Sequence, residues 1–218
     1  MINCLKLFVF TTLILLLFAC SAATPIPSVS VSSINLKSDS SFNGSNAKVL
    51  SSLLANLNSS ENGNIVSSGR PVTLHFGSLP ANILGSTDCN ITDNVCDITI
   101  SNDINPNSGT DQSSATFLSE LLEFVLLHEI GHSFGLGHVA DPTAVMYWQV
   151  NESQLGNYLT QAVLNDYYND VALIRTKGDS SGLPLFTQNV NSGVTKADEG
   201  KTLPEEEIEN RESVNYHL

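Results

Sequence analysis

Positive charge is the scarcest property of this 218-residue chain. It has 9 Lys and Arg residues against 22 Asp and Glu residues, which gives a formal net charge of −13. Because basic side chains cluster nowhere, we do not expect a nucleic acid or an anionic membrane surface as a partner. Many of the acids gather near the C-terminus, between Asp198 and Glu212, which is typical of a solvated tail.

Long apolar runs are also missing, with one exception at the N-terminus. Leu7–Phe18 is apolar apart from two Thr and follows Lys6; the run is typical of a signal-peptide core and too short to span a membrane comfortably. We therefore expect residues 1–20 to be a signal peptide and the protein to be exported. Residues 17–20 resemble a bacterial lipobox, so we favour Cys20 as a lipidated first residue anchored in the cell envelope. Cleavage after Ala23 and free secretion are the alternative.

Cysteine is scarce as well, with four in the whole chain. Cys4 is removed with the signal peptide, and Cys20 is either lipidated or lost, which leaves Cys89 and Cys96. In the oxidising compartment of an exported protein we expect these two to form one disulfide. Two free thiols or a pair of zinc ligands are the alternatives, and no further ligands lie nearby in the sequence.

Histidine, although there are only five, is concentrated in residues 128–138, His-Glu-Ile-Gly-His-Ser-Phe-Gly-Leu-Gly-His. On a helix, His128 and His132 project from one face, because they are four residues apart. Gly135 can end that helix and let the chain turn, which brings His138 to the same metal. Three neutral imidazoles leave the fourth zinc position open to water, as a catalytic site requires, and Glu129 is placed to take a proton from that water. A purely structural zinc would need a fourth protein ligand, and none is evident.

This string resembles the pattern His-Glu-x-x-His-x-x-Gly-x-x-His of the metzincin zinc endopeptidases. Met146, eight residues after the last histidine, resembles the Met-turn of that group, and Ala-Val-Met-Tyr is most similar to the matrixin branch. Val139 and Trp148 depart from the residues usual there, and no cysteine-switch motif is present, so latency through a thiolate is not expected.

The resemblance assigns roles to individual side chains. It implies that His128, His132 and His138 bind one catalytic Zn²⁺ and that Glu129 is the general base. Met146 would form an apolar floor beneath the metal, and Tyr147 is a candidate substrate contact.

The remaining pattern predicts one α+β domain of metzincin-like fold, with a small mixed, twisted sheet, an active-site helix and a C-terminal helix. We expect a tether over residues 21–45, although weak alternation from Ser28 to Leu36 also fits a first strand. The catalytic domain is expected over 46–177, with helices at 47–58 and 160–175 and strands at 71–76 and 96–100. Residues 178–218 are expected to be an acidic, mostly disordered tail, with a strand or docking segment at Leu183–Phe186 as the alternative.

Other candidate ligands are weaker. Asp103 and Asp111 could bind Ca²⁺, but their Asn- and Gly-rich segment is more typical of a plain loop. His75 falls on the polar side of a strand and is expected to face solvent.

These patterns favour a monomeric, exported zinc endopeptidase acting on a peptide or protein. The alternative is an envelope-anchored binding or structural module on the same scaffold, with weak or no peptidase activity. The substrate, set by the loop over 147–160, and an inhibitory role of residues 24–45 stay open.

Overall fold

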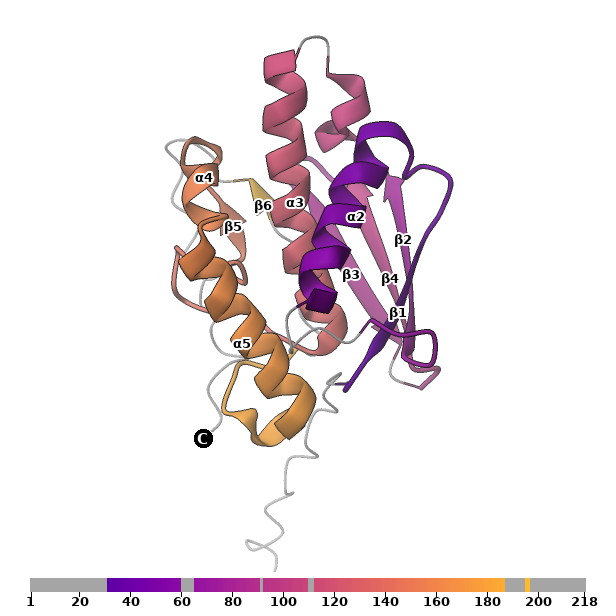
Figure 1. Ribbon diagram of the computed structural model, residues 1–218, viewed down its shortest axis with the longest axis vertical. Coiled ribbons are helices and arrows are strands. Elements are labelled where there is room, and N and C mark those ends of the chain that lie inside the picture. The colour runs from indigo at the N-terminus through magenta and orange to yellow at the C-terminus, as the bar shows by residue number, and fades with distance from the viewer. Residues whose placement is uncertain (1–30, 60–64, 91, 110–111, 187–194, 197–218) are drawn as a thin grey trace, which may run out of the picture.

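The computed structural model describes residues 31–59, 65–90, 92–109, 112–186 and 195–196 (Figure 1). The predicted signal peptide and Cys20 lie outside these residues. The strands are β1 (Ile34–Ser38), β2 (Arg70–Gly77), β3 (Gly85–Asn90), β4 (Val95–Ser101), β5 (Gln149–Val150) and β6 (Thr195–Lys196). The α-helices are α2 (Gly44–Ser59), α3 (Gln112–Phe134), α4 (Leu155–Tyr158) and α5 (Gln161–Lys177), and short 3-10 turns lie at Asn102–Ile104, Pro106–Ser108, Glu152–Gln154 and Gly178–Ser181.

A four-stranded mixed sheet with the order β1-β2-β4-β3 forms one layer. β1, β2 and β4 are parallel, and β3 pairs antiparallel with β4 at one edge. In β2, Val72 and Leu74 are buried while Thr73 is exposed, as the alternation in the sequence predicts. The sheet therefore has one apolar face, which needs a covering layer.

The helices α2 and α3 supply that layer and lie side by side over the sheet (Figure 1). The i, i+3, i+7 stripe of α2 is buried, with Leu50, Leu53 and Leu57 at most 6% exposed. The predicted helices at 47–58 and 160–175 are confirmed as α2 and α5, each slightly longer than expected. The predicted α+β fold with a mixed sheet, an active-site helix and a C-terminal helix is thus confirmed.

The helix α3 is enclosed along its second half, where every residue from Phe124 to Phe134 is buried. The helix α2 and the strands β3 and β4 contact it on one side, and α4 and α5 contact it on another. Tyr167 of α5 donates a hydrogen bond from its hydroxyl to the Leu127 carbonyl oxygen at 2.7 Å. A helix enclosed in this way has no polar face toward solvent, so its histidines lie inside the protein.

The predicted tether over residues 21–45 is wrong for its last part. Ile34–Ser38 pairs with β2 as an edge strand of the sheet, and Ile34 is fully buried. The helix α2 then begins at Gly44, before the predicted domain boundary at 46. The sequence signal was weak because a five-residue strand at the sheet edge buries little of its length.

The expectation of a structureless tail after residue 178 also needs correction. Phe186 is 4% exposed and belongs to the core, and Leu185 forms a β-bridge with Leu136. Farther along, β6 pairs in parallel with β5. The alternative, a docking segment at Leu183–Phe186, is therefore the correct one.

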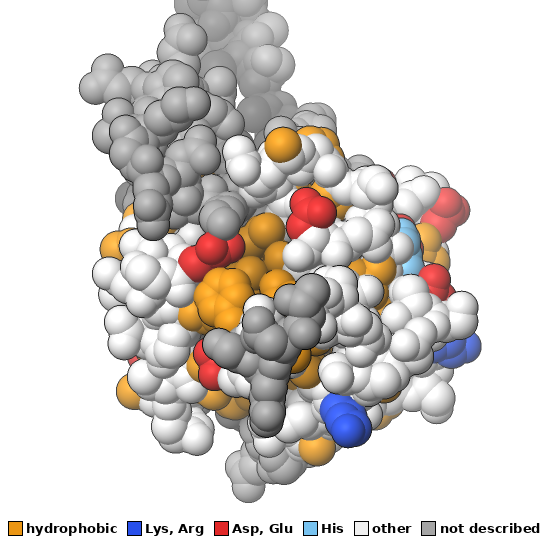
Figure 2. All heavy atoms as spheres, turned by 90° about the horizontal axis from the view of Figure 1, so that it is seen from above, with side chains coloured by type: hydrophobic (Ala, Val, Ile, Leu, Met, Phe, Trp, Pro, Cys, Tyr) orange, Lys and Arg blue, Asp and Glu red, His pale blue; other side chains and the backbone are white. Residues whose placement is uncertain are grey.

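Acidic character marks the surface as well. On the face shown in Figure 2, Asp and Glu side chains border an apolar patch, whereas Lys and Arg side chains are few and lie toward the edge of the view. Within the described residues, no helix is both long enough and apolar enough to cross a membrane.

The predicted disulfide is present between Cys89 of β3 and Cys96 of β4. The two residues are direct cross-strand partners, and both are buried. The bond closes the connection between the edge strand and the centre of the sheet.

Removing this disulfide should destabilise the fold without changing it. For Cys89→Ala/Cys96→Ala we expect the free energy of unfolding to fall by about 2 kcal/mol, because the unfolded chain regains the freedom of a short loop. Urea denaturation measures this change. Reductant should destabilise the wild-type chain similarly and leave the double variant unaffected; equal stability of all samples would contradict the expectation.

Candidate metal centre

The C-terminal end of α3 determines where the third histidine lies. Gly135 has φ of +110°, a conformation that other residues rarely adopt, and it ends the helix as predicted. Its N–H donates to the His132 carbonyl oxygen at 2.9 Å, and the Leu136 N–H donates to the Gly131 carbonyl oxygen at 3.0 Å. These two bonds form a Schellman motif. The motif turns the chain sharply, so that His138 returns toward the helix face.

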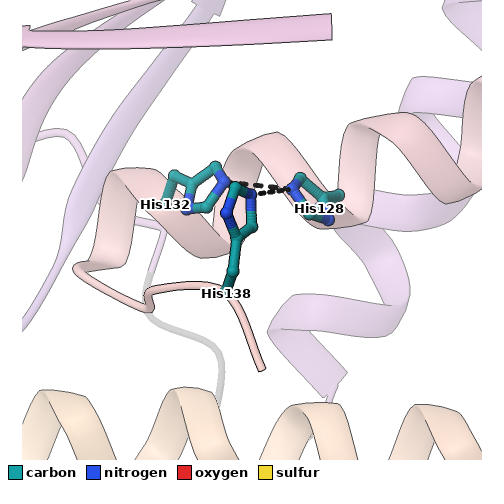
Figure 3. Close-up of side chains that lie close together, drawn as sticks. All are labelled: His128, His132 and His138. Carbon is teal, nitrogen blue, oxygen red and sulfur yellow. Dashed lines mark hydrogen bonds between the residues drawn. The ribbon is translucent and has the colours of Figure 1, made fainter. Parts of the chain in front are cut away.

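Three imidazole Nε2 atoms converge at this turn (Figure 3). The Nε2 atom of His128 lies 3.0 Å from that of His132 and 3.2 Å from that of His138. One ligand atom from each of the three residues falls within 4.8 Å of the others. The structure thus brings together all three predicted ligands.

The opposite ring nitrogens fix the protonation of two of these histidines. His128 Nδ1 lies 2.8 Å from the Val145 carbonyl oxygen, and His132 Nδ1 lies 2.7 Å from the Leu136 carbonyl oxygen. A carbonyl oxygen only accepts, so each Nδ1 carries the proton and each Nε2 presents a lone pair to the centre. Burial lowers the pKa of His128 to about 4 and that of His132 well below its usual value, so both rings are neutral at pH 7.

This arrangement fits a zinc ion. Converging lone pairs repel one another unless a cation lies between them, and neutral imidazoles whose other N–H donates to a carbonyl are the usual zinc ligands. Tetrahedral zinc with bonds of about 2.0–2.1 Å separates its ligand nitrogens by roughly 3.3 Å, close to the separations found here. Among the described residues no further group of three His, Cys, Asp or Glu forms such a site.

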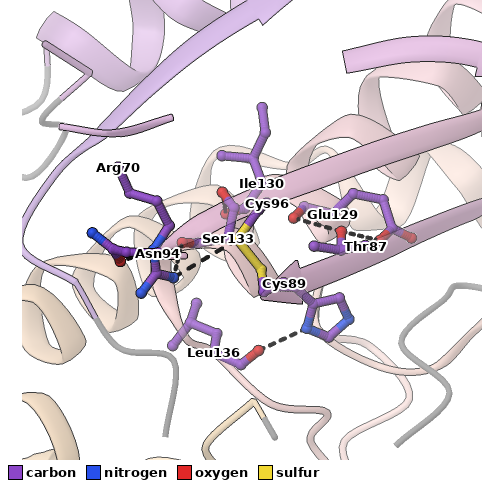
Figure 4. The surroundings of a disulfide bond; sticks show 10 residues. Arg70, Thr87, Cys89, Asn94, Cys96, Glu129, Ile130, Ser133 and Leu136 are labelled. Atoms are coloured by element: carbon purple, nitrogen blue, oxygen red, sulfur yellow. Dashed lines mark hydrogen bonds between the residues drawn. A yellow bond between two sulfur atoms is a disulfide. The ribbon is translucent and has the colours of Figure 1, made fainter. Parts of the chain in front are cut away.

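Glu129 lies beside the histidines between α3 and the edge strand β3, and it is fully buried (Figure 4). Its Oε2 accepts a hydrogen bond from Thr87 Oγ1 at 2.6 Å. Thr87 is 1% exposed and comes from β3. A neutral donor therefore holds one oxygen of this carboxylate, and its orientation depends on the sheet as well as on the helix.

Met146 packs beneath the histidines, as predicted for the Met-turn. It is 3% exposed, and a Cβ added at Gly131 would lie 2.5 Å from its Sδ. Its carbonyl oxygen accepts from the Val139 N–H at 3.1 Å, which ties the turn to the residue after His138. The turn therefore supports two ligands, because the neighbouring Val145 carbonyl also holds the His128 ring.

Helix, glycine turn, third histidine and Met-turn now stand in the arrangement that the motif predicts. The family model described as Matrixin matches residues 27–167, which is more than half of the chain. The chain belongs to the matrixin family. Matrixins are metzincins and zinc metalloproteases, so the predicted family and fold are confirmed. No curated protein matches this matrixin.

Other predicted residues lie apart from this centre or stay untested. Tyr147 is half-buried beside Trp148, and its contact with substrate stays a prediction. Asp103 is exposed, and Asp111 lies outside the described residues, so calcium stays untested. His75 is partly exposed and lies 3.5 Å from an oxygen of Asp97, which agrees with its placement on the polar side of the strand.

Two residues that matter at the site were not found from the sequence. Thr87 gave no signal, because a threonine in a strand is common and its partner Glu129 is 42 residues away. Arg70 is buried, and its guanidinium donates to the Ser133 carbonyl oxygen at 3.2 Å and to Asn94 Oδ1 at 2.9 Å (Figure 4). An arginine at the start of a strand was the only available hint, and sequence does not reveal burial.

The ligand set predicts how zinc binding responds to substitution. We expect about one zinc per chain, and His132→Ala should lose it, because two imidazoles bind the ion far less tightly than three. His75→Ala is the matched control and should keep full occupancy. Elemental analysis after dialysis measures both; full zinc in the His132 variant would refute the assignment.

Proposed function

We propose that this chain is an exported zinc endopeptidase that hydrolyses peptide bonds in peptides or proteins. The observation that carries the proposal is the convergence of three imidazoles on one point, with the Glu129 carboxylate buried beside them. Glu129 is the only acidic side chain that is fully buried among the described residues. Burying a carboxylate is costly, so its presence here supports a chemical role rather than a structural one.

Zinc bound by the three histidines would supply a Lewis acid that polarises the scissile carbonyl and makes water acidic enough to react near neutral pH. Glu129 takes a proton from the attacking water as the new carbon–oxygen bond forms. It then gives that proton to the leaving amine as the carbon–nitrogen bond breaks. Thr87 donates to Oε2 and so holds the carboxylate in one orientation for both transfers.

The edge strand β3 is the surface against which we place the substrate. It pairs with β4 on one side, and no described strand covers its other edge. An extended peptide can add to such an edge through main-chain hydrogen bonds. Thr87 lies in β3, so a peptide paired there would pass close to Glu129.

Export is a further part of the proposal. The apolar run over residues 7–18 and the Cys89–Cys96 disulfide both favour an oxidising compartment outside the cytoplasm. The lipobox-like residues 17–20 favour an anchor at Cys20, which mass spectrometry of the mature N-terminus would test.

Glu129→Gln separates an enzyme from an inactive scaffold. The variant should keep zinc and fold but lose peptide cleavage by about 10² to 10⁴-fold, the usual contribution of a general base. A peptide library with and without chelator supplies the assay and the cleavage profile. If the wild-type chain binds zinc but cleaves nothing, the binding-module alternative gains; if the variant cleaves as fast as the wild type, the mechanism is wrong.

Thr87→Val tests whether the hydroxyl positions the general base. Valine has nearly the same shape but cannot donate, so we expect kcat to fall about tenfold, while zinc content and KM stay unchanged. Thr87→Ser keeps the hydroxyl and should restore most of the rate. Equal rates in the valine and serine variants would show that the hydrogen bond has no role in turnover.

A further inference from the structure

The segment Leu183–Phe186, called the strap below, lies against the loop that carries the third histidine. The Gly137 N–H donates to the Pro184 carbonyl oxygen at 2.8 Å, and the Phe186 N–H donates to the Gly135 carbonyl oxygen at 2.8 Å. Between these bonds, Leu136 and Leu185 form an antiparallel bridge. The strap thus adds a short second strand to the loop between the helix end and His138.

The ring of Phe186 covers one of the ligands. Its centroid lies 4.8 Å from that of the His132 imidazole, the two planes differ by 32°, and the phenylalanine is 4% exposed. His132 is also held by its bond to the Leu136 carbonyl oxygen. The strap therefore contacts this ligand twice, directly through Phe186 and indirectly through the loop.

The loop and the strap approach so closely that residue 137 has no room for a side chain. A Cβ at Gly137 would lie 2.7 Å from the Leu185 carbonyl oxygen, a backbone atom that cannot move aside cheaply. Without the strap, a loop with glycines at 135 and 137 would have few restraints on its backbone. His138 follows directly, so its position depends on that loop.

The strap lies beyond residue 167, where the match to the matrixin model ends. We propose that it locks the third-ligand loop and slows the loss of zinc from the three histidines. Groups that orient metal ligands typically change metal affinity by about 10- to 100-fold when removed. The proposal rests on the zinc site described above, but only for its metal readout.

Two truncated chains test it in a matched way. A chain ending at Gly182 lacks the strap, and a chain ending at Gln188 keeps it; both lack β6 and the acidic tail. We expect zinc release to a chelator to be at least about tenfold faster from the shorter chain, and equal for the longer chain and the full chain. Equal release from all three would overturn the proposal.

A point substitution and a metal-free measurement complete the test. Phe186→Ala should speed release, whereas Phe186→Leu, which keeps apolar cover, should lie near the wild type; equal rates in both variants would count against a role of the ring. In the metal-free chains, exchange of the Gly137 amide hydrogen should be faster when the strap is absent. If the full chain bound no zinc, the proposed function would fail, and this exchange rate would still decide for or against the locked loop.

Discussion

The site depends on how the C-terminal end of α3 satisfies its backbone carbonyl groups. The last carbonyls of a helix have no partner within it, and burial makes each unpaired group costly. Here every carbonyl from Gly131 to Leu136 has a partner, and the first two are satisfied within the turn itself. The donors are Gly135 and Leu136 N–H for Gly131, Gly135 N–H for His132, Arg70 for Ser133, Val31 N–H for Phe134, Phe186 N–H for Gly135 and His132 Nδ1 for Leu136. Segments from both ends of the domain and from β2 therefore meet at one helix end, and a metal ligand is among the donors.

That helix end also shapes the electrostatics. Among the described residues Arg70 pairs with no carboxylate, yet its cation lies at the negative end of the α3 dipole, which favours it. Burial lowers the pKa of Arg70 to about 10, so the side chain stays charged at pH 7. His128 and His132, farther along the same helix, are kept neutral by burial. One buried region thus holds a fixed cation beside the helix terminus and lone pairs directed at the metal position.

Sequence predicted the parts of the site that are local and missed those that depend on distant contacts. The i, i+4 spacing of His128 and His132, and the turn at Gly135, follow from helix geometry and glycine conformation alone. The Cys89–Cys96 pair could be predicted from scarcity and compartment. Thr87 and the strap could not, because a single hydroxyl or a four-residue segment has no periodicity, and its value lies wholly in what it meets after folding.

The strap shows why composition is a poor guide to where a domain ends. Residues after 178 are polar and acidic on average, which indicates a solvated tail, yet Phe186 among them is as buried as Leu84 in the core. A segment of four residues can be ordered by two backbone hydrogen bonds and one apolar side chain when its docking surface is already formed. The surface here is the rigid turn after α3. A chain segment placed on that turn acts on the metal position directly, because the turn is also the shortest covalent path between His132 and His138.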